Sequence, residues 1–343
     1  MTAVDVFSGP GGMTLGFKAA GFRIECAVEI NPDAVATYTA HTSPPSHIIG
    51  DIARIDFRKF NGKCDIVFGG PPCQPFSLGG LNRGRRDRRD MIPEFVRVLQ
   101  EVKPFCFVME NVPGLTLRAH KAYFESVLNL MLDAGYRLNW SVVNAADFGI
   151  PQKRKRLFLV GFRDRIFQFP LPTHGRGRKN PHVASGSFVG KTPIGEPPDC
   201  PVKYARFPDL RPSPYAGHIY NGGGRPLNLA EPAHTILASS GGYKTHWVDT
   251  LGVAPQYHKH LMGGGEPREG VVPGARRLSV EECALLQSFP EKMKFIGSRS
   301  SRYTQVGDAV PPLLAEIIAE SVSKQAEGPP HCGPASAVQA TLL

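Results

Sequence analysis

The sequence lacks the features of a membrane protein and of a disulfide-bonded scaffold. No apolar run approaches the ~20 residues that a helix needs to cross a bilayer. The opening stretch MTAVDVFSGPGG has no basic segment ahead of an apolar one, so we expect no signal peptide. The seven cysteines are scattered and never spaced as CxxC, which disfavours a zinc site and a disulfide framework. We therefore expect a cytoplasmic protein with no membrane partner and no metal.

The sequence also lacks a dinucleotide-binding fingerprint. Its glycine-rich stretch FSGPGG, residues 7–12, departs from the spacing GxGxxG. A nicotinamide-dependent dehydrogenase is therefore disfavoured, and it would leave Cys73 unexplained. A redox or protease role for Cys73 is disfavoured too, because the sequence offers neither CxxC nor a histidine nearby.

What the sequence has in excess is positive charge. Lys and Arg number 40 against 30 Asp and Glu, which gives a formal net charge of +10 over 343 residues. Five arginines lie within residues 82–90, and QKRKR spans residues 152–156. This balance fits a polyanion partner, and the arginine-rich loop suits a mobile flap that grips phosphates.

The first 162 residues predict an α/β fold with a doubly wound, mostly parallel sheet. Short β-branched segments alternate with helical patterns, which is typical of parallel strands joined by helices. Asn31 and Pro32 suit the N-cap and the first turn of a helix. The expected strands are AVDVF, RIECAVEI, HIIGDI, CDIVFGG, FCFVMEN, LNWSVVNA and RLFLVGF, and the expected helices are 14–20, 32–40, 91–102 and 123–134.

After residue 162 the composition changes, and we expect a second, smaller and irregular domain. Residues 163–275 are rich in Gly, Pro, His and Arg and show little helical periodicity. A helix is predicted over 279–289, with Ser279 as N-cap and Glu282 completing a capping box. The predicted organisation is a larger domain at 1–162 completed by a C-terminal helix at about 303–325, a smaller domain at 163–302, and a disordered tail at 326–343.

Three successive predicted strand ends carry groups suited to a nucleoside. The glycine-rich turn at 7–12 lets backbone amides approach a ligand. Glu29 ends the second strand, where a carboxylate can accept hydrogen bonds from ribose hydroxyls, and Asp51 ends the third, where it can meet an adenine amino group. Since ligands of such sheets collect at the carboxyl ends of the strands, we expect one shared site.

Cys73 lies in GGPPCQPFS, residues 69–77, just after a predicted strand. Pro71 and Pro72 supply no backbone N–H and force extended geometry before them, so Cys73 cannot lie inside a helix or a central strand. Glu110 ends the next strand, and we expect its carboxyl to face the same crevice as a candidate general acid. The cysteines that we interpret as buried hydrophobic residues are Cys26, Cys64, Cys106 and Cys283.

The motifs, in their order along the chain, resemble those of DNA cytosine-5 methyltransferases of the bacterial restriction–modification type. They cover the chain from end to end, except for the segment between QKRKR and RRLSVEE and the tail. Proline-cysteine-glutamine followed by ENV and QxRxR is highly specific for this family. The matching stretches are DVFSGPGG, the strand-end Glu29, GDI at 50–52, GGPPCQPFS, MENV at 109–112, QKRKR, RRLSVEECALLQSFP and QVGDAVPP at 305–312.

The resemblance implies an enzyme that methylates C5 of a cytosine flipped out of a specific duplex DNA site, with S-adenosylmethionine as methyl donor. It implies that Cys73 attacks C6 as a thiolate, because C5 is a poor nucleophile until a group adds at C6. By the same resemblance, Glu110 holds the N3 and N4 edge and lends a proton at N3, Arg156 holds O2, and Arg154 supports the loop.

The resemblance also implies contacts to the cofactor and to DNA. Residues 163–302 take the position of the target recognition domain, with a hinge helix at 279–289, and 1–162 that of the catalytic and cofactor-binding domain. Ser77 and Arg88 resemble phosphate and flap contacts. The cofactor pattern carries over to Phe7, Gly9, Gly11, Glu29, Ile30, Asp51, Ile52 and Pro72, to which we add Asp308.

Asp308 departs from the family pattern, which usually has Asn after the glycine of QVGDAVPP. An ionised Asp308 can only accept hydrogen bonds, and its charge close to Cys73 would raise the pKa of the thiol. Two interpretations stay open. Asp308 is either paired with an arginine or the cofactor's ammonium group, which we favour, or held protonated as a mimic of the amide.

Two alternative functions stay open. An RNA-directed cytosine-5 methyltransferase of the same fold would carry the same basic flap, although the long insert favours duplex DNA. A non-catalytic DNA-binding relative would be expected to have lost Cys73 or Glu110, and neither is lost. We expect a monomer on double-stranded DNA in a bacterial cytoplasm, with any cognate restriction endonuclease making no stable contact.

Overall fold

Two compact units make up the described chain. The computed structural model describes residues 1–42, 46–72, 90–329 and 338–340. Neither unit is continuous in sequence, because the chain leaves the first unit twice and returns to it. The sheet unit comprises Met1–Asn144, Lys155–Pro172 and Val310–Leu343, and the insert unit comprises Ala145–Arg154 and Thr173–Ala309.

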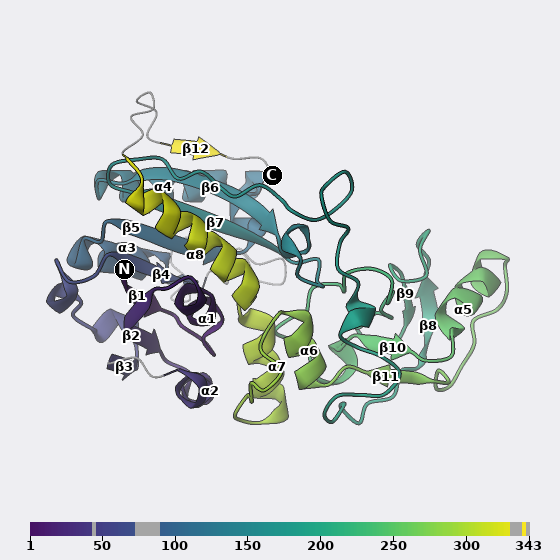
Figure 1. The fold of residues 1–343 in the computed structure, drawn as a ribbon. Coiled ribbons are helices and arrows are strands. Elements are labelled where there is room, and N and C mark those ends of the chain that lie inside the picture. Colours follow the sequence, from purple (N-terminus) through teal and green to yellow (C-terminus); the bar gives the residue numbers. More distant parts are fainter. Residues whose placement is uncertain (43–45, 73–89, 330–337, 341–343) are drawn as a thin grey trace. The chain divides into compact units, whose positions relative to one another are not determined.

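A twisted sheet is the centre of the sheet unit (Figure 1), and its described strands follow the order β12-β6-β7-β5-β4-β1-β2-β3. Neighbouring strands are parallel except around β7, which runs antiparallel to β5 and to β6. The prediction of a mostly parallel sheet is confirmed. The strands are β1 Thr2–Val6, β2 Arg23–Glu29, β3 Ser46–Ile49, β4 Ile66–Gly69, β5 Cys106–Asn111, β6 Arg137–Asn144, β7 Lys155–Phe162 and β12 Val338–Ala340.

Helices cover both faces of this sheet, as a doubly wound fold requires. Val67 of β4 packs in one core with α3 and α4, whereas Phe68 stacks on Phe17 of α1 with ring centroids 3.9 Å apart. Because successive side chains of a strand point to opposite faces, α1 lies opposite α3. The helices are α1 Gly12–Ala19, α2 Pro32–His41, α3 Ile92–Val102, α4 Lys121–Asp133 and α8 Pro312–Glu327, with 3-10 turns η1 Ile52–Arg54, η2 Arg58–Phe60, η5 Pro113–Thr116 and η6 Arg118–His120.

The insert unit packs short strands around an aromatic core. The buried rings of Tyr220 and Trp247 lie 4.9 Å apart, and Tyr257 joins them in the same cluster. Ser279 and Glu282 form the predicted capping box at the start of α6. The elements are η7 Ala145–Phe148, η8 Ser185–Ser187, β8 Tyr204–Asp209, β9 His218–Tyr220, η9 Gly242–Lys244, β10 Trp247–Asp249, α5 Val253–Met262, β11 Ala275–Arg277, α6 Val280–Leu286 and α7 Arg299–Asp308.

The C-terminal part differs from the prediction in two places. The single helix expected at about 303–325 is two helices, α7 in the insert unit and α8 in the sheet unit. Pro311 and Pro312 separate the two helices, because prolines lack the N–H groups that would continue α7. The disordered tail expected at 326–343 was wrong for its described residues, since α8 continues to Glu327 and β12 pairs with β6. The outer edge of β6 offers backbone groups for this pairing.

The units also divide differently from the expected boundary at residue 162. Residues 145–154 belong to the insert unit because the buried side chains of Gln152 and Arg154 donate to its backbone carbonyls. Residues 163–172 stay with the sheet unit, where Asn139 Nδ2 donates to Phe167 O at 2.7 Å. Buried polar contacts, rather than the change of composition, decide where each unit ends.

Candidate active site at the carboxyl edge of the sheet

The glycine-rich turn leaves β1 with a backbone that few side chains adopt. Phe7 has φ 62°, Gly9 φ 55° and Gly11 φ 96°, and the left-handed region is unfavourable for a bulky residue such as Phe7. A Cβ on Gly11 would lie 3.1 Å from the ring of Tyr38, whereas one on Gly9 would meet nothing within 4 Å. The turn is therefore fixed from beneath at Gly11 and uncrowded at Gly9.

Glu29 joins this turn to the end of β2. Its Oε2 accepts from Gly9 N at 2.8 Å, and its Oε1 accepts from Ile30 N at 2.9 Å and Asn31 N at 2.8 Å. A carboxylate has about four acceptor positions, so a hydroxyl can still bond to it. The side chain of Ile30 is 65% exposed beside it.

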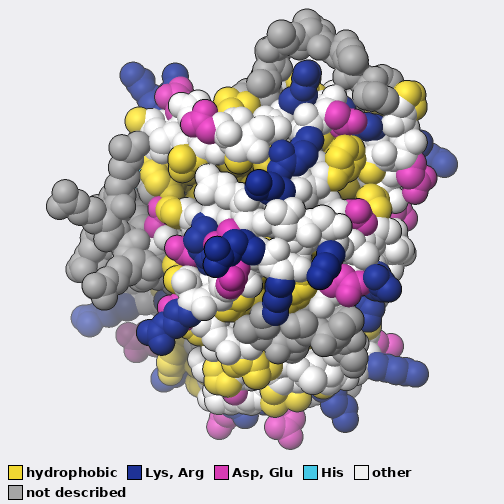
Figure 2. Space-filling model, turned by 90° about the vertical axis from the view of Figure 1, so that its left-hand side faces the viewer, with side chains coloured by type: hydrophobic (Ala, Val, Ile, Leu, Met, Phe, Trp, Pro, Cys, Tyr) yellow, Lys and Arg dark blue, Asp and Glu magenta, His cyan; other side chains and the backbone are white. Residues whose placement is uncertain are grey.

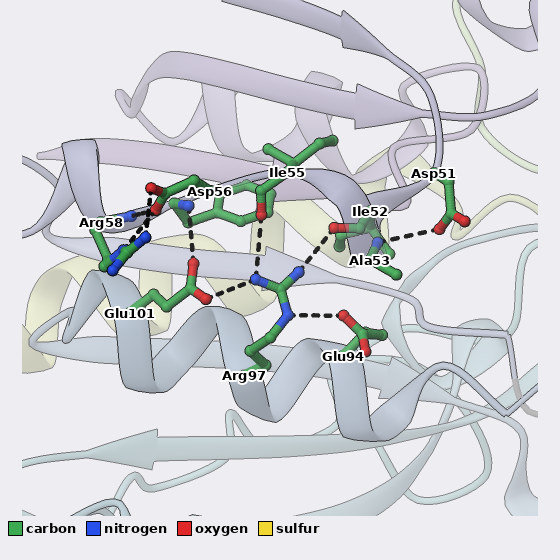
Figure 3. Close-up of polar contacts among 10 residues, drawn as sticks. Asp51, Ile52, Ala53, Ile55, Asp56, Arg58, Glu94, Arg97 and Glu101 are labelled. Atoms are coloured by element: carbon green, nitrogen blue, oxygen red, sulfur yellow. Dashed lines mark hydrogen bonds and ion pairs between the residues drawn. The ribbon is translucent and has the colours of Figure 1, made fainter.

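The third strand end presents Asp51 and an isoleucine that sequence reasoning missed. Asp51 Oδ1 caps η1 by accepting from Ala53 N at 3.0 Å (Figure 3). Ile52, which the family pattern singled out, is only 3% exposed and packs in the core. Ile49 is 63% exposed and lies opposite Glu29 in the β2–β3 register. Because Ile48 and Ile49 are adjacent apolar residues, the sequence alone does not indicate which of the two is exposed.

Asp5 is a buried carboxyl beneath the same turn. Thr14 Oγ1 donates to Asp5 Oδ2 at 2.5 Å and lies 3.0 Å from Tyr38 Oη. Burial, opposed by the Thr14 hydrogen bond and aided by the charge of Glu29, raises the pKa of Asp5 well above its usual value. Its Oδ1 has no hydrogen-bond partner among the described residues. No sequence pattern marked Asp5 as unusual.

Glu110 and Arg156 form an ion pair at the centre of the site. Because β7 runs antiparallel to β5, its first residues lie at the carboxyl end of β5, with Glu110 opposite Phe158. Arg156 Nε lies 2.9 Å from Glu110 Oε1, and the two side chains are 14% and 10% exposed. Arg156, the last residue of QKRKR, therefore lies at the same edge of the sheet as Glu110.

The segment that leads to Cys73 is anchored beside this pair. Asn111 Nδ2 donates to Pro71 O at 3.1 Å, and Met91 N donates to Pro72 O at 3.0 Å. A Cβ on Gly70 would lie 2.9 Å from Glu110 Oε2, so glycine lets the carboxylate lie against the backbone. Three of the predicted site residues, Cys73, Ser77 and Arg88, lie outside the described residues.

Arg154 and Asp308 belong to the insert unit. Arg154 is fully buried and donates through Nη1 to Ile236 O at 3.0 Å and through Nη2 to Gly307 O at 2.7 Å and Ala309 O at 2.9 Å. It therefore fixes residues 145–154 to the end of α7. Asp308 is the last residue of α7 and is exposed.

Four other cysteines have the packing role that the sequence predicted. Cys26, Cys64, Cys106 and Cys283 are buried. Burial raises the pKa of the Cys64 thiol to about 12, and it raises the pKa values of Cys106 and Cys283 as well. Thiols held protonated in this way are poor nucleophiles.

Among the described side chains on the face drawn in Figure 2, charges of both signs are interspersed. Within residues 1–42, 46–72, 90–329 and 338–340, no cluster of His, Cys, Asp and Glu could hold a metal ion. None of the helices described there is long and apolar enough to span a membrane.

Comparison with known proteins identifies relatives along most of the chain. Residues 1–185 and 225–324 match the family described as C-5 cytosine-specific DNA methylase. The type II methyltransferase M.AplI of Arthrospira platensis is 34% identical over 96% of this chain and 88% of its own length. M.NgoPII of Neisseria gonorrhoeae is 30% identical over 95% of this chain and 96% of its own length.

Solved structures share the fold at low sequence identity. The Entamoeba histolytica methyltransferase EhMeth is 13% identical, with a TM-score of 0.68 over 96% of this chain and 99% of its own. A Spodoptera frugiperda DNMT2 mutant is 15% identical, with a TM-score of 0.67 over 94% of this chain and 99% of its own. These likenesses concern architecture alone.

Proposed function

Because the chain belongs to the C-5 cytosine-specific DNA methylase family and is therefore a DNA cytosine-5 methyltransferase, we propose that it acts on a cytosine flipped out of a specific duplex site and bonds Cys73 covalently to C6. The observation that carries this proposal is the Glu110–Arg156 pair, 2.9 Å apart beside the anchored Pro71–Pro72 segment. Glu110 provides a carboxyl group and Arg156 a cation, beside the backbone segment that precedes the proposed nucleophile Cys73 in sequence.

Cys73 makes C5 reactive by adding to C6. As its thiolate forms the S–C6 bond, the electrons of the C5=C6 double bond become available at C5. S-adenosylmethionine, when bound, supplies the methyl group. A solvent water then takes the proton from C5, the electrons of that C–H bond re-form the C5=C6 double bond, and the S–C6 bond breaks to release the thiolate. Cys73 is thus regenerated.

Glu110 and Arg156 handle the charge that this addition creates. Negative charge spreads to N3 and O2 when the thiolate attacks, so a proton at N3 and a cation at O2 both stabilise the transition state. Glu110 must take up a proton when the base enters, which it then lends to N3, and it accepts from the N4 amino group. Arg156 turns part of its guanidinium toward O2 while its Nε keeps Glu110 in place.

The cofactor residues fit a nucleoside with a hydrophobic flank. Glu29 retains acceptor capacity for ribose hydroxyls beside the uncrowded Gly9. Asp51 would receive the adenine amino group, and the exposed side chains of Ile30 and Ile49 would flank the base. The remaining predicted contacts are Phe7, Gly11, Ile52 and Pro72, and Asp308 paired with the cofactor's ammonium group or an arginine.

We assign sequence recognition to the insert unit. The family match leaves out residues 186–224, which contain β8 and β9, as expected for a segment that varies with the DNA site. Ser77 and Arg88 would grip phosphates. Because DNA is the substrate, we assign the enzyme to the cytoplasm as a monomer, alongside any cognate restriction endonuclease.

Bisulfite sequencing of DNA from a host that expresses the protein tests this function. We expect protected cytosines at one recurring sequence, and none when the Cys73→Ser variant is expressed. Transfer of labelled methyl groups to bulk tRNA, measured in parallel, should be absent. Methylation of tRNA with none of DNA would contradict the proposed substrate.

A further inference from the structure

Arg97 lies on α3 and fixes the segment that begins at Asp51 (Figure 3). Its Nη2 donates to Ile52 O at 2.7 Å, and its Nη1 donates to Ile55 O at 3.1 Å. Ile52 O follows Asp51 directly, so one side chain of α3 holds the backbone beside the carboxylate proposed to meet adenine.

Two carboxylates of α3 complete the same network. Arg97 Nε donates to Glu94 Oε2 at 2.8 Å, and Nη1 donates to Glu101 Oε1 at 2.7 Å. Glu101 Oε2 in turn accepts from Phe57 N at 2.8 Å. The segment 52–57 is therefore tied to α3 at both of its ends.

The network is partly shielded from water and holds a permanent charge. The Arg97 side chain is 28% exposed and lies over the ring of Phe57, 5.8 Å from its centroid. Burial alone would lower the pKa of Arg97, but the hydrogen bonds that it donates to the carboxylates of Glu94 and Glu101 outweigh burial and raise that pKa. A planar guanidinium can serve carbonyls and carboxylates together, which a lysine ammonium does much less well.

The segment has little regular structure of its own to hold Asp51. It contains two short 3-10 turns, η1 and η2, and Asp51 caps the first of them. The hydrogen-bond geometry of a carboxylate with an amino group tolerates only small displacements. Loosening the backbone at Ile52 would therefore move the Asp51 acceptor away from the base.

We propose that Arg97 is a positioning residue that sets the affinity and base selectivity of the cofactor site by holding the 52–57 segment to α3. This inference rests on the proposed function, in which Asp51 meets the adenine amino group of S-adenosylmethionine. In this proposal Arg97 acts through the carbonyls of Ile52 and Ile55, to which it donates, and not by contact with the cofactor.

Calorimetric binding of S-adenosylhomocysteine tests the inference without requiring catalysis. For Arg97→Met we expect the dissociation constant to rise about tenfold. Selectivity is measured with S-inosylhomocysteine, in which an oxygen replaces the amino group opposite Asp51. The wild type should prefer the adenosyl compound, and Arg97→Met should lose most of that preference. Arg58→Met is the matched control, because the exposed Arg58 pairs with Asp56 in the same segment, and it should change both values less than twofold.

Arg97→Lys keeps the positive charge and provides a second test if Arg97→Met does not fold. It should fall between the wild type and Arg97→Met in both affinity and base preference, with an unfolding curve like that of the wild type. A folded Arg97→Lys or Arg97→Met with wild-type preference would overturn the inference. So would an equal loss for both ligands, which indicates general weakening of the site. A wild type that binds neither ligand would overturn the proposed cofactor as well.

Discussion

Arg156 of the sheet unit and Arg154 of the insert unit are separated in sequence only by Lys155, yet they have different partners. Arg156 pairs with the carboxylate of Glu110, whereas Arg154 donates to the carbonyls of Ile236, Gly307 and Ala309. In the insert unit the buried Arg277 also donates to carbonyls, those of Cys200 and Thr245.

This difference distinguishes an arginine that can contact a substrate from one that holds the backbone in place. A carboxylate paired with an arginine can exchange part of that contact for a polar substrate, because both groups keep further hydrogen-bonding capacity. An arginine surrounded by carbonyls fixes several backbone segments at once and cannot leave without exposing buried acceptors. We therefore expect substitutions at the sheet-unit pair to affect turnover and substitutions at Arg154 to affect folding.

Glu110→Gln should give the largest effect on turnover. Glutamine keeps the shape and can accept from N4, but it supplies no proton at N3, so kcat should fall on the order of 10²- to 10⁴-fold. Single-turnover methylation measures this loss, with cofactor binding as the control. A kcat within threefold of the wild type would show that Glu110 does not supply the N3 proton, and it would contradict the role assigned to the sheet-unit pair.

Arg154→Met should destabilise the insert unit by about 3 kcal/mol, because it strands buried carbonyl acceptors. Arg156→Met is the matched variant and should cost less stability, because the one group that it leaves without its partner, the carboxylate of Glu110, can take up a proton and become neutral. The chain has two tryptophans, Trp140 in the sheet unit and Trp247 in the insert unit. Urea unfolding in a Trp140→Phe background therefore reports on the insert unit. Equal destabilisation by both substitutions would contradict the assigned roles.

His246 should make the insert unit sensitive to acid. Its Nδ1 accepts from Arg225 N and its Nε2 donates to Thr235 O. Protonation would add an N–H at Nδ1 that points at the N–H of Arg225, so the hydrogen bond would be lost. Burial lowers the pKa of His246 to about 4. An unfolded histidine titrates near 6.5, so the unfolded state binds the proton first as the pH falls, and about 3 kcal/mol is lost between pH 7 and pH 4.

Trp247 fluorescence in the Trp140→Phe background follows this loss across pH. His246→Gln has no titrating ring and should flatten the slope of unfolding free energy between pH 4 and 6.5. An unchanged slope in that variant would assign the acid sensitivity to another group.

Asp5 should give the sheet unit a response to pH of opposite sign. Its folded pKa is raised by burial, so its protonated form contributes stability that is present below about pH 4 and is lost as the pH rises. One proton limits the slope to about 1.4 kcal/mol per pH unit. Asp5→Asn should remove this slope when Trp140 fluorescence is followed in a Trp247→Phe background. A slope that survives Asp5→Asn would assign it to another group of the sheet unit.

The sequence predicted the residues whose chemistry depends on strand ends. The position of Glu110 follows from the end of an apolar run, and that of Arg156 from a basic motif directly before another apolar run. The antiparallel direction of β7 explains why the two side chains meet. Such positions are predictable because the carboxyl edge of a parallel sheet is set by local pattern.

Residues whose role depends on tertiary contacts could not be predicted in this way. Arg97 looks like a solvated residue on an amphipathic helix, and Asp5 like any acidic residue near a glycine turn. Ile52 matches the family pattern, but its side chain is buried, whereas Ile49 is exposed and does not belong to that pattern. Where α7 ends and α8 begins follows from two prolines, but which unit each helix joins depends on packing.

Covalent capture of duplex DNA that carries 5-fluorocytosine tests the proposed chemistry most directly. Fluorine cannot leave C5 as a cation, so the thiolate cannot be eliminated after methyl transfer. In the presence of S-adenosylmethionine, the wild type should form a complex that survives denaturing electrophoresis, and Cys73→Ser should form none while still binding the duplex. A complex formed equally by Cys73→Ser, or no complex from a wild type that methylates ordinary DNA, would contradict the bond between Cys73 and C6.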